Sequence, residues 1–215
     1  MDFFSKVLVA YLLGSIVGSL VVGRLRGGVD IRTLGSGNAG STNAVRTQGL
    51  GFGIWVIVID VAKGWLAASL LPRLAIPGIA PAQGAAAAWL PAACAFAAII
   101  GHVFPVWHGF RGGKGVATLV GAYAGLQFVL LAPLVVSWLA VVMVSGYVGL
   151  SSIAASLAIP VYLLIRDGAH VTPLMGFALA CAALVMFTHR GNVKRMRAGT
   201  ESRARKLWLF GRGRG

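Results

Sequence analysis

The chain has 215 residues, of which 58% are hydrophobic and 11% are charged, and its nineteen Lys and Arg residues outnumber five Asp and Glu residues, for a net charge of +14. A soluble domain carries about 25% charged residues, so this composition excludes an ordinary soluble fold. Apolar runs of about 20 residues recur, which suits membrane-crossing helices and is too long for the strands of an outer-membrane barrel. We predict an all-α polytopic membrane protein.

Seven apolar stretches predict the transmembrane helices. They cover residues 4–23, 52–71, 84–104, 115–131, 132–149, 151–166 and 171–188. The first lacks a small-x-small cleavage site and is followed by further spans, so we interpret it as a retained helix and not as a signal peptide. The apolar region from Gly115 to Ile165 has only weak breakers, and five spans stay an alternative if some of its segments are re-entrant.

The basic residues gather in three of the segments outside these spans. Residues 24–51 hold four, residues 105–114 hold two and the segment from residue 189 onward holds nine, which is fifteen of the nineteen. Cytoplasmic segments of membrane proteins collect Lys and Arg. We therefore predict an N-terminus outside, a C-terminus in the cytoplasm, and one membrane domain over residues 1–201 followed by a basic tail over 202–215.

The first polar segment is LGSGNAGSTNAVRTQG, residues 34–49. Its glycines let backbone N–H groups approach an anion, and Ser and Asn side chains add neutral hydrogen bonds. A flexible loop rich in turn-forming residues is the alternative. We favour a binding site and take Ser36, Asn38, Asn43 and Arg46 as its candidate catalytic residues.

The second polar segment is WHGFRGGKGVAT, residues 107–118. It is not a nucleotide-binding P-loop, because His108 stands where that motif needs a glycine and Gly115 stands where it needs Ser or Thr. The apolar run that follows suggests a helix N-terminus, which favours bound anions. A loop whose cations only set the topology is the alternative. The candidate phosphate-binding residues are Arg111, Gly112, Gly113, Lys114, Gly115 and Thr118, with Lys114 also a catalytic candidate.

The third polar segment is THRGNVKRMRAGTE, residues 188–201. His189, Asn192 and Arg195 recur every third residue, so a helix would place them on one face. We take His189 and Asn192 as catalytic candidates. Glu201 is surrounded by cations, which favours a structural salt bridge over catalysis.

Five residues within the predicted spans also need an interpretation. Asp60 and Lys63 lie three residues apart within one span, where an isolated charge costs about 2.5–3.5 kcal/mol, so we expect a structural pair, with tuning of a nearby site as the alternative. His102 lies at the cytoplasmic end of the third span and is a catalytic candidate. Cys94 and Cys181 are far apart in apolar runs, and we expect two buried thiols without a disulfide or metal role.

The segments GSGNAGSTNAVR, GHVFPVWHGFRGGKGVAT and HRGNVKRMRAGTE together resemble the signature of the bacterial membrane acyl-phosphate:glycerol-3-phosphate acyltransferases. The weaker stretch SGYVGLSSIAASLAIP is also similar to that family, and the likeness covers residues 3–201. The resemblance implies seven helices and acyl transfer from acyl phosphate to the 1-hydroxyl of glycerol 3-phosphate. It also implies an active site at the cytoplasmic side of the bacterial inner membrane. Arg111 departs from the Lys that is common in the family, which replaces a point charge by a planar fork.

We expect direct attack by the substrate hydroxyl without an acyl-enzyme, because an acyl phosphate already has a good leaving group. The proton acceptor stays open among His189, His102 and a substrate phosphate oxygen. The His-x4-Asp motif of other glycerolipid acyltransferases is absent and the five acidic residues are scattered. We therefore expect no cofactor and no metal requirement.

Two other functions fit parts of the sequence. A transporter for an organophosphate anion fits the charges within the spans, but no polar chain continues toward the outer face. A membrane anchor that binds nucleic acid fits the tail but not the glycine-rich segments. We expect the partners to be glycerol 3-phosphate, acyl phosphate and membrane lipid, with no nucleic acid and, as a functional neighbour, the enzyme that makes acyl phosphate.

Overall fold

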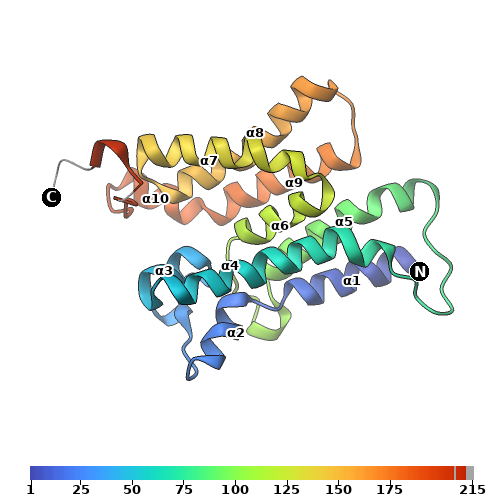
Figure 1. Ribbon diagram of the computed structural model, residues 1–215, viewed down its shortest axis with the longest axis horizontal. Coiled ribbons are helices and arrows are strands. Elements are labelled where there is room, and N and C mark those ends of the chain that lie inside the picture. Colours follow the sequence, from blue (N-terminus) through green and yellow to red (C-terminus); the bar gives the residue numbers. More distant parts are fainter. Residues whose placement is uncertain (206, 212–215) are drawn as a thin grey trace. The chain divides into compact units, whose positions relative to one another are not determined.

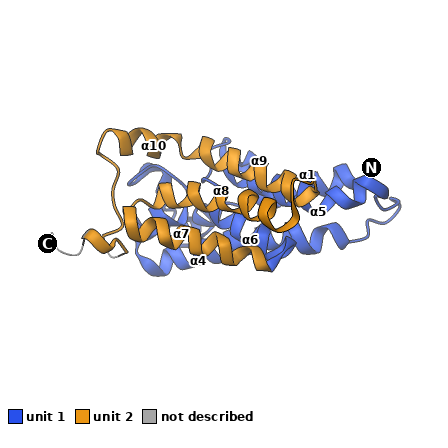
Figure 2. Cartoon of the chain, turned by 90° about the horizontal axis from the view of Figure 1, so that it is seen from above, with its two compact units in different colours: residues 1–128 blue, residues 129–215 orange. Residues whose placement is uncertain are grey.

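The computed structural model describes residues 1–205 and 207–211, and within them all regular structure is helical (Figure 1). Contacts group the chain into two compact units, residues 1–128 and 129–215 (Figure 2). The division into a membrane domain over residues 1–201 and a basic tail over 202–215 stays a prediction.

The first unit contains six α-helices and short helical turns. In chain order its elements are α1 (Asp2–Gly14), α2 (Gly18–Leu25), η1 (Ile31–Thr33), α3 (Ser41–Gln48), α4 (Leu50–Trp65), the π-helical turn η2 (Leu66–Leu70), η3 (Leu71–Arg73), α5 (Gly84–Val103), η4 (Val106–His108) and α6 (Val116–Leu126). Helix α1 packs on α5, and α4 packs on both α3 and α6.

The second unit contains the remaining helices. They are α7 (Leu131–Ser145), α8 (Val148–Asp167), α9 (Pro173–Thr188), α10 (Arg190–Arg197) and the short turn η6 (Leu209–Gly211), while η5 (Phe128–Leu130) joins the units. Helix α8 packs against α7, α9 and α10.

Every predicted span coincides with a helical region, but not every region has the length of a span. Four are long and apolar enough to cross a membrane: 50–73, 84–108, 128–145 and 148–167. The pairs α1–α2 and α9–α10 pass only as bent pairs, at 46° and 49°, so the structure supports four to six spans. Helix α6 has eleven residues, about 17 Å at 1.5 Å per residue, against a hydrocarbon core of about 30 Å.

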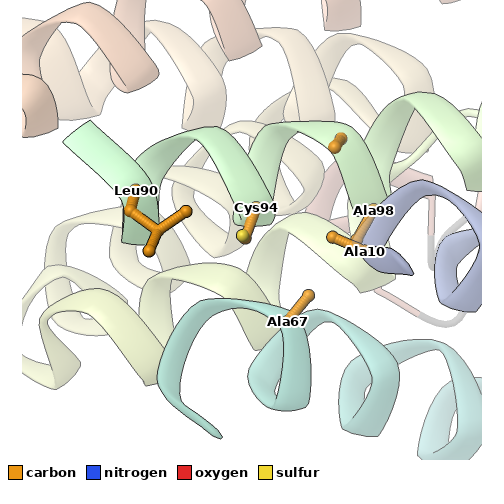
Figure 3. Packing of buried hydrophobic residues seen from close by; sticks show 6 residues of the cluster. Ala10, Ala67, Leu90, Cys94 and Ala98 are labelled. Atoms are coloured by element: carbon orange, nitrogen blue, oxygen red, sulfur yellow. The ribbon is translucent and has the colours of Figure 1, made fainter. Parts of the chain in front are cut away.

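Small residues let the helices of the first unit approach closely. A Cβ added at Gly14 would lie 2.1 Å from the Ala98 carbonyl oxygen, and one at Gly101 would lie 2.2 Å from the Tyr11 carbonyl oxygen, so α1 and α5 meet at paired glycines. The adjoining core is formed by six buried side chains from α1, η2 and α5, five of them labelled in Figure 3: Ala10, Ala67, Leu90, Cys94, Ala97 and Ala98. Membrane helices commonly associate through such small residues because lipid provides no hydrophobic driving force between helices.

Candidate functional site

The break between α1 and α2 lies inside the predicted first span, and polar groups from α4 satisfy its backbone. The N–H of Gly18 at the start of α2 donates to Asp60 Oδ1 over 3.1 Å. Lys63 Nζ donates to the Ile16 carbonyl oxygen over 2.7 Å. An anion suits the positive end of a helix and a cation suits exposed carbonyl groups. The charged pair therefore makes a broken helix tolerable in an apolar environment.

Asp60 and Lys63 form the pair expected from their spacing, and His102 joins it. Lys63 Nζ lies 2.8 Å from Asp60 Oδ1 and 2.9 Å from His102 Nδ1. Asp60 Oδ1 is also 3.3 Å from His102 Nδ1. All three side chains are at most 3% exposed. We call these three residues the buried triad.

The glycine loop, residues 111–115, begins next to the buried triad. The N–H of Gly112 donates to the Val103 carbonyl oxygen and the N–H of Gly113 to that of His102, each over 3.1 Å. A Cβ at Gly113 would lie 2.1 Å from His102 Nε2. This corrects the prediction that both amides face a phosphate, because the last carbonyls of α5 already accept their hydrogen atoms. The two glycines permit close packing instead.

The glycine loop leads directly into α6. Gly115 adopts a φ of +86° and stands immediately before the helix, as the sequence suggested. The first N–H groups of a helix have no partner within it, so this end can still receive an anion. Arg111 is exposed and Lys114 is half-buried. Thr118 is fully buried, and among the described residues its Oγ1 has no hydrogen-bond partner.

Asn43 organises the first polar segment from within. The two hydrogen atoms on its Nδ2 are shared among three carbonyl oxygens, at 2.9 Å for Ile31, 3.0 Å for Leu34 and 3.1 Å for Asn38. Its Oδ1 accepts from the Ser36 N–H over 2.9 Å. The side chain is 2% exposed. These contacts use Asn43 to shape the backbone of the segment, which is a scaffolding role beside the catalytic one that the sequence suggested.

The other candidates of this segment are more accessible. Ser36 and Arg46 are exposed, and Asn38 is half-buried. The segment is fixed to α2 where the Ser19 hydroxyl donates to the Ala39 carbonyl oxygen over 2.7 Å. Because the backbone is held on two sides, it presents Ser36 and Asn38 on a defined loop.

Arg32, two residues before the first polar segment, contacts the second polar segment, a link that no sequence pattern predicted. Its Nη1 donates to the carbonyl oxygens of His108 and Arg111, each over 3.0 Å. The same guanidinium is paired with Asp30 at 2.7 Å. This hydrogen-bonded pair lowers the pKa of Asp30 and raises that of Arg32. The Asp-x-Arg spacing indicates this pair but not the contact with the second segment.

The second unit has a polar cluster of its own around α10. His189 is buried, and its Nδ1 lies 2.9 Å from the Val185 carbonyl oxygen, to which it must donate. Glu201 accepts from Asn192 Nδ2 and from Arg195 Nε, each over 2.6 Å. Asn192 and Arg195 thus share a face of α10, and Glu201 forms a salt bridge in the manner expected of it.

Part of the predicted tail packs against the turn between α7 and α8. The Ala204 N–H donates to the Gly146 carbonyl oxygen over 2.8 Å. The Arg203 guanidinium lies 4.6 Å from the centre of the Tyr147 ring and 4.1 Å from that of Trp208. Lys206 and residues 212–215 of this tail lie outside the described residues.

The comparisons with known proteins agree on one family. A family model described as "Glycerol-3-phosphate acyltransferase" matches residues 4–199. The chain is 42% identical over 195 residues to a glycerol-3-phosphate acyltransferase of Thioalkalivibrio sulfidiphilus, covering 91% of this chain and 90% of that one. It is 38% identical over 226 residues to the protein of that name from Chlorobaculum tepidum, covering 94% and 97%.

Two solved structures are also similar, both of PlsY (YgiH), described as an integral membrane glycerol 3-phosphate acyltransferase. The glycerol 3-phosphate form has a TM-score of 0.79 and 31% identity, covering 94% of this chain and 96% of that one. The lysophosphatidic acid form has a TM-score of 0.79 and 30% identity, covering 98% and 100%.

Proposed function

The chain belongs to the glycerol-3-phosphate acyltransferase family, and on that basis we propose that it transfers a fatty acyl group from acyl phosphate to the 1-hydroxyl of glycerol 3-phosphate. The products are lysophosphatidic acid and inorganic phosphate. The observation that carries this proposal is the cationic glycine loop at the start of α6, which Arg32 ties to the segment organised by Asn43. Both substrates carry a phosphate, and this pair of loops offers cations and polar groups with few carboxylates.

In this proposal the end of the glycine loop binds the phosphate. Arg111, Lys114 and the first amides of α6 supply positive charge and N–H donors, with Gly115 allowing the chain to turn into the helix. Gly112 and Gly113 contribute by packing and not through their amides. Thr118 sits on the first turn of α6, and its buried hydroxyl is the remaining candidate donor there.

Catalysis then depends on positioning the two substrates and on stabilising the oxyanion of the tetrahedral intermediate. Phosphate leaves readily, so the glycerol 3-phosphate hydroxyl attacks the acyl carbon directly and no acyl-enzyme forms. Ser36, Asn38 and Arg46 orient the acceptor and the reacting carbonyl, while Asn43 holds their loop in place.

His189 and Asn192 are the proposed reaction residues of the second unit. Because His189 Nδ1 donates to a carbonyl oxygen, the neutral ring carries its lone pair on Nε2, which can accept a proton. The alternative acceptor is a phosphate oxygen of the substrate. In H189Q, loss of turnover with glycerol 3-phosphate binding retained identifies the histidine as the base, whereas an active variant with an unchanged pH–rate profile identifies the substrate.

The proposed topology has seven spans, an N-terminus outside, and the three polar segments at the cytoplasmic face of the bacterial inner membrane. Its support is the placement of fifteen of the nineteen cations. Helix α6 then enters the bilayer only part of the way. Labelling of single cysteines introduced at exposed Gly27 and Gly78 from each side of sealed vesicles tests this arrangement, with Gly27 expected to react from the cytoplasmic side and Gly78 from the outer side.

Membrane lipid is a proposed partner at α10. This helix bends 49° away from α9, and an open groove of about 410 Å³ is lined there by Met186, Arg190, Val193, Lys194 and Arg197. Cations beside apolar side chains at a membrane surface suit anionic headgroups. The enzyme that makes acyl phosphate stays a proposed functional neighbour, and the absence of a metal or cofactor requirement stays a prediction.

One assay tests the donor. Purified protein is incubated with labelled glycerol 3-phosphate and either acyl phosphate or acyl-CoA, with and without a chelator. Lysophosphatidic acid from acyl phosphate alone, unaffected by the chelator, is the expected result. Product from acyl-CoA alone contradicts the proposed donor, and uptake of label into proteoliposomes without any product contradicts the enzyme in favour of an organophosphate transporter.

A further inference from the structure

Lys63 uses every hydrogen atom of its ammonium group, two of them within the buried triad. Its three acceptors are the Ile16 carbonyl oxygen at 2.7 Å, Asp60 Oδ1 at 2.8 Å and His102 Nδ1 at 2.9 Å. An ammonium has three donors and no lone pair, so each of these partners must accept. His102 Nδ1 therefore carries a lone pair and no hydrogen atom.

The contact with Lys63 determines which nitrogen of the His102 ring carries a hydrogen atom. With Nδ1 accepting, the neutral ring has its hydrogen atom on Nε2. A doubly protonated ring would place a second N–H against the Lys63 ammonium at 2.9 Å inside the protein. The competing arrangement, with Nδ1–H donating to Asp60, has the longer distance of 3.3 Å. The geometry thus favours a neutral ring with an N–H at Nε2.

Nε2 lies against the glycine loop. The ring packs on Gly113, where a Cβ would come within 2.1 Å of Nε2, and the Gly113 N–H is already occupied by the His102 carbonyl oxygen. The polar contacts that the ring makes with other described residues go through Nδ1. Its donor is therefore available to a ligand at this loop.

We propose that Lys63 and Asp60 are positioning residues that hold His102 neutral and protonated on Nε2, so that Nε2–H donates a hydrogen bond to the phosphate bound at the glycine loop. This rests on the proposed function, which supplies the phosphate. In this role His102 is a fixed hydrogen-bond donor and not the general base, which removes it from the candidates for the proton acceptor. Asp60 contributes by holding the Lys63 ammonium in place.

Two substitutions of His102 distinguish the roles of the two ring nitrogens. The amide of H102N lies near the position of Nδ1, so it keeps an acceptor for Lys63 and loses the group at Nε2. The amide of H102Q reaches the position of Nε2, so it keeps that donor and leaves Lys63 without its third acceptor. A purely structural histidine predicts that H102N is the more stable and the more active variant.

The proposal predicts that stability and activity move in opposite directions. We expect H102N to unfold at the higher temperature, yet to lose about 10²-fold in kcat, as when one donor to developing charge is removed. H102Q should unfold earlier and stay within about 10-fold of the wild-type kcat. If H102N equals or exceeds H102Q in kcat, the donor role is wrong.

Nitrogen NMR of histidine-labelled protein in nanodiscs reads the ring directly, without substrate turnover, and H102Q identifies the signal. We expect Nδ1 unprotonated and Nε2 protonated in the wild-type protein, and a mixture of the two neutral forms in K63M. A wild-type ring protonated on Nδ1, or an unchanged ring in K63M, overturns the proposal. Absence of acyl transfer by wild-type protein overturns the proposed function alone, since the ring assignment does not depend on it.

Discussion

Replacement of Asn43 by Ala and by Asp tests how the first polar segment is held. Asn43 Nδ2 contacts three carbonyl oxygens between 2.9 and 3.1 Å, and Oδ1 accepts one N–H. N43A removes all four of these contacts. N43D is closer in shape and keeps the acceptor for the Ser36 N–H, but it turns an oxygen toward three carbonyl oxygens.

The two costs can be compared from these contacts. A hydrogen bond contributes about 1 kcal/mol net, and the exposed parts of the loop can bond to water once released, so N43A should destabilise the first unit by about 2–3 kcal/mol. N43D places a carboxylate without a counter-charge at a site that is 2% exposed. Leaving a buried charge uncompensated costs about 3–5 kcal/mol. The variant that resembles asparagine more closely should therefore be the less stable one.

The two free cysteines provide the assay. Cys94 is buried in the first unit and Cys181 in the second. In a C181S background, a thiol-reactive dye reports exposure of Cys94 as the first unit unfolds. On heating, the midpoint temperature of this exposure should fall by about 2–4 °C for each kcal/mol of stability lost. The fall should be larger for N43D than for N43A.

Stability and activity should agree in this series. Both variants should lose activity with glycerol 3-phosphate, since Ser36 and Asn38 depend on the loop. A C94A background, in which Cys181 reports the second unit, is the matched control for a general loss of stability. If N43D is as stable as N43A or more so, the Nδ2 hydrogen bonds do not hold the segment and the scaffolding role is refuted.

Three further predictions concern the neighbouring contacts. R32K keeps a charge beside Asp30 but cannot also bridge the second loop, so KM for glycerol 3-phosphate should rise about 5- to 30-fold, the equivalent of about 1–2 kcal/mol; an unchanged KM contradicts the link. G113A places a methyl group against His102 and should lower kcat/KM at least 10-fold, whereas G51A, which meets no atom within 4 Å, should match the wild-type protein in the same assay. Because Arg32 lowers the pKa of Asp30, the ion pair contributes fully to stability above about pH 4 and is lost only as pH falls through the lowered pKa. The activity ratio of D30N to wild type should therefore be constant from pH 5 to 9. A ratio that varies with pH in this range contradicts the lowered pKa of Asp30.

The sequence predicted the helical regions because long apolar runs leave little choice of structure in a bilayer. It did not predict the break after Gly14, since the residues that stabilise it, Asp60 and Lys63, lie more than forty positions away. The length of α6 was overestimated, because apolar composition continues past Leu126 where the helix ends.

The polar segments were identified by composition, but their internal contacts were not. Glycine content indicated close backbone approach, and at Gly112 and Gly113 the N–H groups donate to the last carbonyl oxygens of α5. Arg32 was counted only as a topological charge, because nothing in the sequence reveals that two distant carbonyl groups accept from it. Pairing of Asp60 with Lys63 could be predicted, since both ends of that contact lie on one helix.

Direct acyl transfer is the central claim, and a single-turnover experiment tests it most directly. Purified protein is mixed with radiolabelled acyl phosphate, with and without glycerol 3-phosphate, and quenched at successive times. The proposed mechanism predicts lysophosphatidic acid only when glycerol 3-phosphate is present and no label on the protein at any time. Label that accumulates on the protein and then moves to lysophosphatidic acid when glycerol 3-phosphate is added would contradict it.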